Sequence, residues 1–223
     1  MNGGPLIKAA MRSADIGHLA DQIQRLEAAG IDALHFDVMD GRFAPEISWG
    51  PLFIRGLRRY TRLLFEVHLL VDEPESCADQ YLEAGADGVL LHIEASRDPL
   101  AALHRIHAQG RQAGLAIAPG TPAEKLEPYL DACDSVNVMT VAPGAPGALS
   151  EAGLATLGQV AAMVRRRGGA QLVQVDGAVS SATRERFLEA GAQVLVAGYP
   201  IFSTQDFGQA VAALRHGAEE VVT

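Results

Sequence analysis

Short apolar runs alternate with amphipathic stretches along the chain. Several of these runs have the length and continuity of buried β-strands. They cover residues 6–10, 63–70, 115–117, 135–139 and 172–175. Between the strands, apolar residues recur at the spacing of one helix face. The expected helices cover about 17–29, 50–59, 74–84, 98–110, 123–130, 151–167, 181–190 and 206–216, and those at 50–59 and 123–130 are short.

A repeated segment supplies the remaining strands. It reads LEAAGIDALHFD at 26–37, LEAGADGVLLHI at 82–93 and LEAGAQVLVAGY at 188–199. In each copy a helix ends at Leu-Glu-Ala, a glycine stops it and a short apolar strand follows. We expect Gly114, in QGRQAGLAIAPG, to play the same part before the strand at 115–117.

Together these elements make eight strand-then-helix units within 223 residues. Near-continuous apolar strands that alternate with helices are typical of a parallel sheet covered by helices. The pattern therefore predicts an α/β fold, a (β/α)8 TIM barrel, with residues 1–223 as a single domain. An open doubly wound sheet is the alternative, but no G-x-G-x-x-G motif follows the first strand.

Polar side chains stand at the ends of three expected strands. His35 and Asp37 share one face of the second strand, because side chains alternate along a strand. His68 ends the third strand and Asp176 the seventh. Taken singly, each has a structural explanation, and Asp176 before Gly177 also fits a turn. In a barrel, however, all four point to one spot, and two imidazoles with two carboxylates suit Zn²⁺ or Fe²⁺.

Other features near these strand ends are less specific. Met39 and Met139 end the second and sixth strands. They are either core residues or an apolar wall beside a metal. His92 ends the fourth strand and has no assigned role. Glycine-rich loops follow the sixth, seventh and eighth strands, where Gly177 and Gly198 fit phosphate binding by backbone N–H groups. His104, His107 and His216 fall on helix surfaces.

Composition narrows the class of protein. The net charge of −9 argues against nucleic acid or an anionic membrane as a partner. No apolar run is long enough to span a membrane, and we expect no secretion signal at the start. Cys77 and Cys133 stand alone without a CxxC motif, as in a reducing compartment. We therefore expect a cytoplasmic protein that acts on a small molecule.

The motifs at these strand ends resemble those of ribulose-phosphate 3-epimerases over nearly the whole chain. The matching stretches, in the family's order, are HFDVMDGRFAP, EVHLLVDEPE, LAIAPGTP, NVMTVAPG, VDGAV and AGYPIF. The resemblance implies a (β/α)8 barrel that interconverts D-ribulose 5-phosphate and D-xylulose 5-phosphate. It also implies a homo-oligomer, either a dimer or a hexamer.

The resemblance further assigns roles by motif position. His35, Asp37, His68 and Asp176 match the family's ligands for one divalent ion, with Zn²⁺ or Fe²⁺ favoured and Mn²⁺ or Co²⁺ as further candidates. Asp37 and Asp176 match its acid/base pair. The implied substrate contacts are His35, Met39, His68, Met139, Gly144, Ala145, Pro146, Gly147, Gly177, Ala178, Gly198 and Tyr199.

The chain also departs from the family's pattern around the substrate. The departures fall at Ala10, Leu70, Ala118, Ala142, Ala148, Ala178 and Tyr199. Pro146 removes one backbone donor from the loop after the sixth strand. Tyr199 brings bulk where the family has a small residue next to the phosphate. Because the chemical centre is intact and the substrate contacts are changed, the pattern suggests an altered substrate.

These residue types match epimerisation at the carbon next to a ketone, C3 of a ketose phosphate. Asp37 and Asp176 would move protons on opposite faces of the substrate, through a metal-stabilised enediolate. The alternatives are an epimerase of a different or unphosphorylated ketose, or a non-catalytic sugar-phosphate-binding paralogue. A decarboxylase of the orotidine-phosphate type needs a Lys between two Asp, which DVMD lacks.

Overall fold

The computed structural model describes residues 4–217. Its strands are β1 (Leu6–Ala10), β2 (Ala33–Met39), β3 (Leu64–Leu70), β4 (Gly88–His92), β5 (Gln112–Ile117), β6 (Ser135–Met139), β7 (Leu172–Asp176) and β8 (Val194–Ala197). They pair in parallel and in chain order into one closed barrel. The predicted (β/α)8 barrel is therefore confirmed. Residues 1–3 and 218–223, which the expected domain includes, lie outside the described residues.

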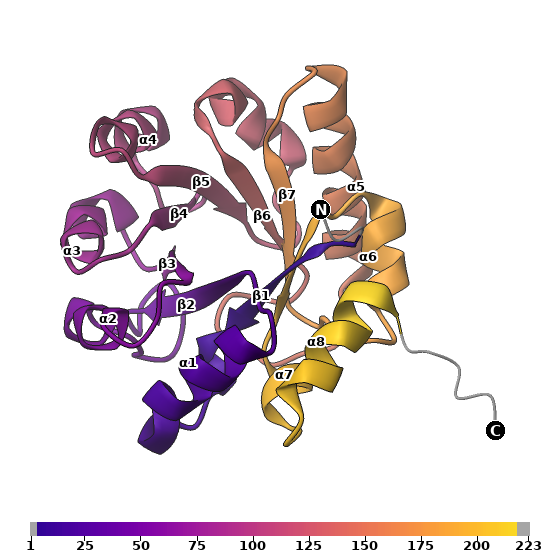
Figure 1. Cartoon of the computed structure of the whole chain (residues 1–223). Coiled ribbons are helices and arrows are strands. Elements are labelled where there is room, and N and C mark those ends of the chain that lie inside the picture. The colour runs from indigo at the N-terminus through magenta and orange to yellow at the C-terminus, as the bar shows by residue number, and fades with distance from the viewer. Residues whose placement is uncertain (1–3, 218–223) are drawn as a thin grey trace.

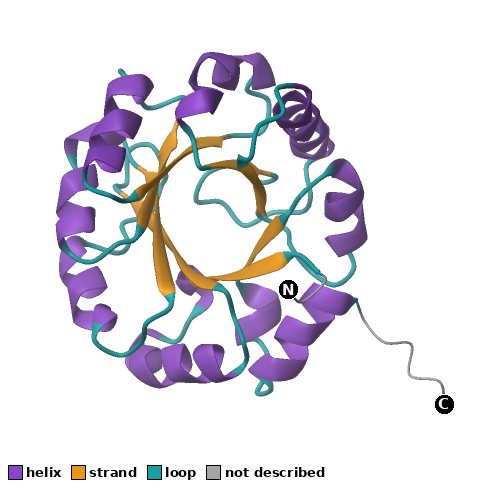
Figure 2. Cartoon of the chain, turned by 45° about the horizontal axis from the view of Figure 1, so that its top comes forward, coloured by secondary structure: helices purple, strands orange, loops and turns teal. Residues whose placement is uncertain are grey.

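Helices surround this barrel on all sides (Figure 2). They are α1 (Leu19–Ala28), α2 (Pro51–Arg58), α3 (Ala78–Glu83), α4 (Pro99–Ala108), α5 (Glu151–Arg166), α6 (Arg184–Ala190), α7 (Tyr199–Phe202) and α8 (Phe207–His216). Figure 1 shows the chain winding once around the ring, so that β8 closes against β1. Within residues 4–217 no helix is long and apolar enough to cross a membrane.

Three expected helices differ from those observed. The stretch at 17–29 starts as the 3₁₀ helix Ile16–His18, and that at 74–84 divides into the 3₁₀ helix Pro74–Ser76 and α3. The stretch at 123–130 is a 3₁₀ helix, Ala123–Ala132. It contains Pro128, which has no N–H to donate to an α-helical hydrogen bond. Helix α7 was not expected, and it makes Tyr199 a helical residue.

The structure also corrects the role expected for Gly114. Helix α4 ends before Gly110, and Gly114 lies inside β5. A Cβ on Gly114 would come within 2.6 Å of both Leu90 Cδ2 and Ser135 Oγ. The residue is therefore a glycine because the neighbouring strands leave no room for a side chain, not because a helix stops there.

Alternation along the strands separates the outer core from the barrel interior. Phe36 and Val38 of β2 point outward and pack with the helices. His35 and Asp37 point inward, and the register of β2 and β3 sets Asp37 beside His68. The register of β6 and β7 likewise sets Met139 beside Asp176. The predicted site residues therefore gather at the C-terminal end of the barrel.

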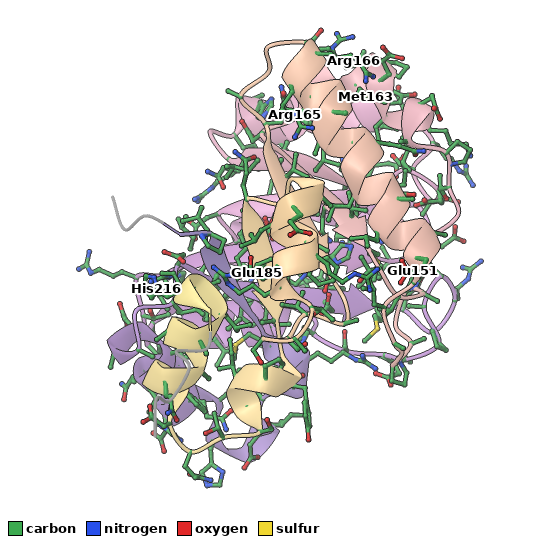
Figure 3. All side chains as sticks on the ribbon, turned by 90° about the vertical axis from the view of Figure 1, so that its right-hand side faces the viewer. Glu151, Met163, Arg165, Arg166, Glu185 and His216 are labelled. Carbon is green, nitrogen blue, oxygen red and sulfur yellow. The ribbon has the colours of Figure 1, made fainter. Side chains whose placement is uncertain are left out.

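Helix α5 begins at this same end of the barrel. Ser150 caps it by accepting a hydrogen bond from Gly153 N, and Glu151 stands in its first turn. Arg165 and Arg166 lie in its last turn, at the far end of the helix from Glu151 (Figure 3). An acidic first turn and a basic last turn complement the helix dipole. The helix thereby gives the loop between β6 and α5 a fixed end.

Candidate active site

Four side chains from three strands converge at the C-terminal end of the barrel. His35 Nε2 and His68 Nδ1 lie 3.3 Å apart, and each lies 3.2 Å from Asp37 Oδ1. Asp176 Oδ2 completes the group at 3.7 Å from His35 Nε2 and 3.5 Å from His68 Nδ1. Both imidazoles are fully buried, and both carboxylates are 8% exposed. Sequence analysis predicted this set of four.

The donor atoms of this cluster fit a bound metal ion. Ligands at about 2.0–2.2 Å from a tetrahedral ion lie about 3.3–3.6 Å from one another. The four donor atoms lie within 4.8 Å of each other, and the separations given above fall close to that range. Two imidazole nitrogens with two carboxylate oxygens are also a donor set that first-row divalent ions accept. Residues and geometry thus both suit such an ion.

The electrostatics of the cluster also favour a bound cation. Burial alone would lower the pKa of His35, but the carboxylates of Asp37 and Glu66 outweigh it and raise that pKa to about 10. The pKa of His68 is also raised, against burial, by Asp176 and Asp37. Burial disfavours a charged Asp37, yet the two imidazoles lower its pKa. The carboxylates therefore create a site that favours positive charge.

A second polar group lies beneath the cluster, inside the barrel. Glu66 Oε1 lies 2.8 Å from His35 Nδ1. Its other oxygen, Oε2, accepts hydrogen bonds from Lys8 Nζ at 2.5 Å and from Gln174 Nε2 at 3.0 Å. Burial opposes the charge on Glu66, but Lys8 and His35 lower its pKa. Sequence analysis assigned no role to Glu66 or to Lys8.

His92, which sequence analysis left without a role, lies beside the cluster rather than in it. Its ring stacks on that of His68 at a centroid distance of 5.0 Å, and the Phe43 ring lies 4.8 Å away. Its Nδ1 lies 2.8 Å from Glu94 Oε2. Burial lowers the pKa of His92. The residue is therefore a packing partner for the His68 ring.

A cavity of about 810 Å³ opens above the cluster. Asp37 and Asp176 lie in its wall, whereas the buried rings of His35 and His68 lie behind them. The other predicted substrate contacts all line the cavity: Met39, Met139, Gly144, Ala145, Pro146, Gly147, Gly177, Ala178, Gly198 and Tyr199. Tyr199 is 78% exposed, at the start of α7. The loops after β6, β7 and β8 therefore enclose one space.

Two arginines in this cavity were missed by sequence analysis. Arg12 follows β1, pairs with Glu46 and donates a hydrogen bond of 3.1 Å to Gly144 O. Arg186 of α6 forms two hydrogen bonds with Glu151, at 2.9 and 2.7 Å. No periodicity or motif marks either arginine, because their roles depend on loops distant in the sequence. Each arginine therefore brings a guanidinium group to the cavity that a glutamate already pairs.

Small hydroxyl residues form another part of the cavity that sequence analysis missed. Ser13, Ser180 and Thr183 line it. A Cβ on Gly198 would come within 2.4 Å of Ser13 Oγ, so the loop after β8 passes directly over that hydroxyl. The same Cβ would lie 3.4 Å from Ala10 Cβ, so Ser13 stands close to Ala10, one of the departures from the family's pattern.

Comparison with known proteins agrees with the geometry. Residues 6–202 match the sequence profile of the Ribulose-phosphate 3 epimerase family. The chain belongs to this family. It is 36% identical over 215 residues to the chloroplastic ribulose-5-phosphate-3-epimerase of Arabidopsis thaliana, covering 94% of this chain and 76% of the plant protein. Ribulose-phosphate 3-epimerase of Mycobacterium tuberculosis is 39% identical, over 97% of this chain and 94% of its own.

Membership of the ribulose-phosphate 3-epimerase family fixes the class of enzyme. The protein is an isomerase, an epimerase that acts on carbohydrates. Among solved structures, 3-hexulose-6-phosphate synthase superposes with a TM-score of 0.71 at 19% identity, covering 94% of this chain and 97% of its own. At that identity the likeness concerns the barrel fold alone.

Proposed function

We propose that this epimerase inverts C3 of a ketose phosphate, D-ribulose 5-phosphate to D-xylulose 5-phosphate or a related pair, by proton transfer between Asp37 and Asp176. The observation that carries the proposal is the convergence of these two carboxylates in one cavity wall. They come from β2 and β7, which are not neighbours in the barrel. A sugar held between them meets a carboxylate on each face.

The reaction follows from these positions. The C3 proton of a ketose lies next to the carbonyl, and its removal leaves an enediolate. One Asp takes the proton from one face, and the other Asp gives a proton to the opposite face, so the configuration inverts. A positioned acid or base of this kind contributes roughly 10²–10⁴-fold. Met39 and Met139 line the same cavity and keep part of its wall apolar.

His35, Asp37, His68 and Asp176 would hold one divalent ion, with Zn²⁺ or Fe²⁺ favoured over Mn²⁺ or Co²⁺. Such an ion supplies Lewis-acid stabilisation of the negative charge that develops on the substrate oxygens. The histidines hold this position from behind the cavity wall, where water does not reach them. The two Asp residues also face the cavity, so each is available for proton transfer.

Recognition of a phosphate is supported by the loops around the cavity. Gly144, Gly177 and Ala178 adopt positive φ angles of 71°, 92° and 52°, and all three line the cavity. Successive backbone N–H groups in such conformations form concave sites for anions. Arg12 and Arg186 also bring guanidinium groups to the cavity, each paired with a glutamate. These features favour a phosphorylated ketose over an unphosphorylated one.

The same cavity supports a second candidate substrate. The chain has alanine at several positions where the resembled family has polar residues, and Ala10 and Ala148 line the cavity. With a volume of about 810 Å³, the cavity has room for a ketose phosphate larger than a pentulose phosphate. A hexulose phosphate epimerised at C3 by the same two carboxylates is therefore the alternative.

A substrate panel tests the proposal. Purified enzyme is incubated with D-ribulose 5-phosphate, unphosphorylated D-ribulose and hexulose 6-phosphates, and products are followed by NMR. We expect inversion at C3 of at least one phosphorylated ketose and much slower turnover of D-ribulose. Turnover of the unphosphorylated sugar at equal efficiency would contradict phosphate recognition. Absence of turnover with the whole panel would contradict the proposed C3 epimerisation of these sugars.

One further feature rests on composition and one on the family resemblance. We propose a cytoplasmic enzyme that assembles as a dimer or hexamer. Sedimentation velocity of the purified protein tests the assembly state, and a species at the mass of a single 23.6 kDa chain would contradict it.

A further inference from the structure

The barrel interior below the cluster holds an ionic group that the proposed chemistry does not use. Lys8 and Glu66, on β1 and β3, are 9% and 8% exposed and join through Nζ and Oε2 at 2.5 Å. Gln174 of β7 donates to the same oxygen at 3.0 Å. A buried ion pair is costly to form and gives little net stability. Its presence here calls for a function.

The contacts of Glu66 indicate that function. Its second oxygen, Oε1, faces His35 Nδ1 at 2.8 Å, while His35 Nε2 faces the other three donors of the cluster. A hydrogen bond at Nδ1 holds the proton there and leaves the Nε2 lone pair for a metal ion. Glu66 is therefore placed to select the tautomer and orientation of His35.

Lys8 completes the arrangement because it acts on Glu66 alone. Its ammonium lies against Oε2, on the side of the carboxylate away from His35. Without Lys8, Oε2 of Glu66 would lose its closest partner in the barrel interior, and the carboxylate would be free to turn away from His35.

We propose that Lys8 and Glu66 form a positioning pair, in which Lys8 holds the orientation of the Glu66 carboxylate and Glu66 presents His35 Nε2 to the divalent ion. This inference rests on the proposed function, because it assigns the pair to the metal site of that function. Gln174 fixes Oε2 of Glu66 from the opposite side of the barrel. None of the three residues lines the cavity, so they act through His35 and not on substrate.

The test measures Zn²⁺ affinity by competition with a chromogenic chelator, in the absence of substrate. The variants are Glu66→Gln, Lys8→Met and the two combined, with Lys8→Gln as a second replacement should Lys8→Met fail to fold. Asn137→Ala is the matched control, because Asn137 is fully buried on β6 and its side chain has no hydrogen-bond partner among the described residues. Circular dichroism selects the folded variants.

We expect Glu66→Gln to weaken Zn²⁺ binding about 10–100-fold, the usual effect of losing such an outer partner. Lys8→Met should weaken it about 10-fold in the wild-type background and not further in the Glu66→Gln background, because Lys8 acts only through Glu66. The control should stay within about twofold of wild type. In ¹⁵N-histidine NMR of the Zn²⁺-loaded wild type, His35 should carry its proton on Nδ1.

Several results would overturn the positioning role. Folded Lys8 and Glu66 variants that bind Zn²⁺ as tightly as wild type, or additive losses in the double variant, would contradict it while leaving the proposed function intact. A deprotonated Nδ1 at His35 in the loaded protein would contradict it as well. A wild type that binds neither Zn²⁺, Fe²⁺ nor Mn²⁺ would contradict both this inference and the metal site of the proposed function.

Discussion

His35 Nε2 and His68 Nδ1 face each other at 3.3 Å on the neighbouring strands β2 and β3. Two imidazole nitrogens this close need a proton or a cation between them, because their lone pairs repel. The carboxylates of Asp37 and Asp176 lie beside the same two nitrogens, and their negative charge favours a cation at this position. The relationship between the two rings is thus the structural basis for a metal site, and the first prediction follows from it.

We expect purified wild-type protein to hold about one divalent ion per chain, and His68→Ala to reduce that content sharply. Removing one of four ligands leaves an open and weaker site. Inductively coupled plasma mass spectrometry measures the content. His104→Ala is a suitable control, since His104 is exposed on α4. Wild-type protein free of metal after purification in metal-replete buffer would contradict this prediction.

The second prediction concerns the two carboxylates. Asp37→Asn and Asp176→Asn should each lower kcat by at least roughly 10²-fold, because an amide neither accepts nor returns the C3 proton. Far-UV circular dichroism should be unchanged. Asp40→Asn is a matched control: Asp40 follows β2 directly, and its carboxylate accepts hydrogen bonds from backbone groups of Arg42 and Asp72. Activity retained in either site variant would exclude that residue as acid or base.

Much of this site could be predicted from sequence because it depends on local rules. Helix-stop glycines divided the chain into units, and strand alternation put His35 and Asp37 on one face. Barrel geometry then brought His68 and Asp176 to the same end. Each of these steps requires only the local sequence pattern and the number of strands in the barrel.

Long-range contacts explain what sequence analysis missed. Lys8 and Glu66 are 58 residues apart, and Arg12 reaches Gly144 across 132 residues. No periodicity encodes such pairs, because they depend on the register of non-neighbouring strands and on loop paths. Gly114 is a case in which the local sequence suggested the wrong role. Its sequence context fits a helix stop, whereas the side chains of adjacent strands determine its role.

A third prediction tests the altered substrate contacts. Ala10→Ser combined with Tyr199→Ser should raise kcat/KM for D-ribulose 5-phosphate, because both residues line the cavity where the resembled family has small polar groups. A hydrogen bond to a charged group contributes roughly 1.5–3 kcal/mol, so one regained contact gives on the order of 10-fold or more.

Steady-state kinetics of wild type and double variant decide this point. A wild-type kcat/KM of about 10⁵ M⁻¹s⁻¹ or more is ordinary for an enzyme on its own substrate. That value for D-ribulose 5-phosphate would contradict an altered substrate and identify the pentulose phosphate as the natural one. A double variant no better than wild type would contradict the roles given to Ala10 and Tyr199.

The fourth prediction concerns stability at acid pH. Glu94 accepts hydrogen bonds from His92 and from Ala118 N, and these contacts overcome burial and lower its pKa from 4.5 to about 2. Because the folded pKa is depressed, the stabilisation is complete above pH 4.5 and is lost as pH falls toward 2. Its size is on the order of 1–3 kcal/mol.

Urea unfolding at pH 5.5, 4.5 and 3.5 measures this contribution. The free energy of unfolding of wild type should fall over this range more steeply than that of Glu94→Gln, which has no carboxylate to protonate. Glu124→Gln is the control, since Glu124 is exposed near the surface of the 3₁₀ helix Ala123–Ala132. Parallel pH dependence of wild type and Glu94→Gln would contradict the assignment.

The most direct measurement of the central claim is solvent deuterium incorporation at C3 during turnover. The enzyme is incubated in D₂O with the ketose phosphate it turns over best, and the product is analysed by NMR. Proton transfer between Asp37 and Asp176 predicts that each inverted molecule carries deuterium at C3. In the Asp37→Asn and Asp176→Asn variants, the rate of inversion and the rate of deuterium incorporation should fall together. Inversion at C3 that retains the original hydrogen in every product molecule, at the wild-type rate, would contradict the account.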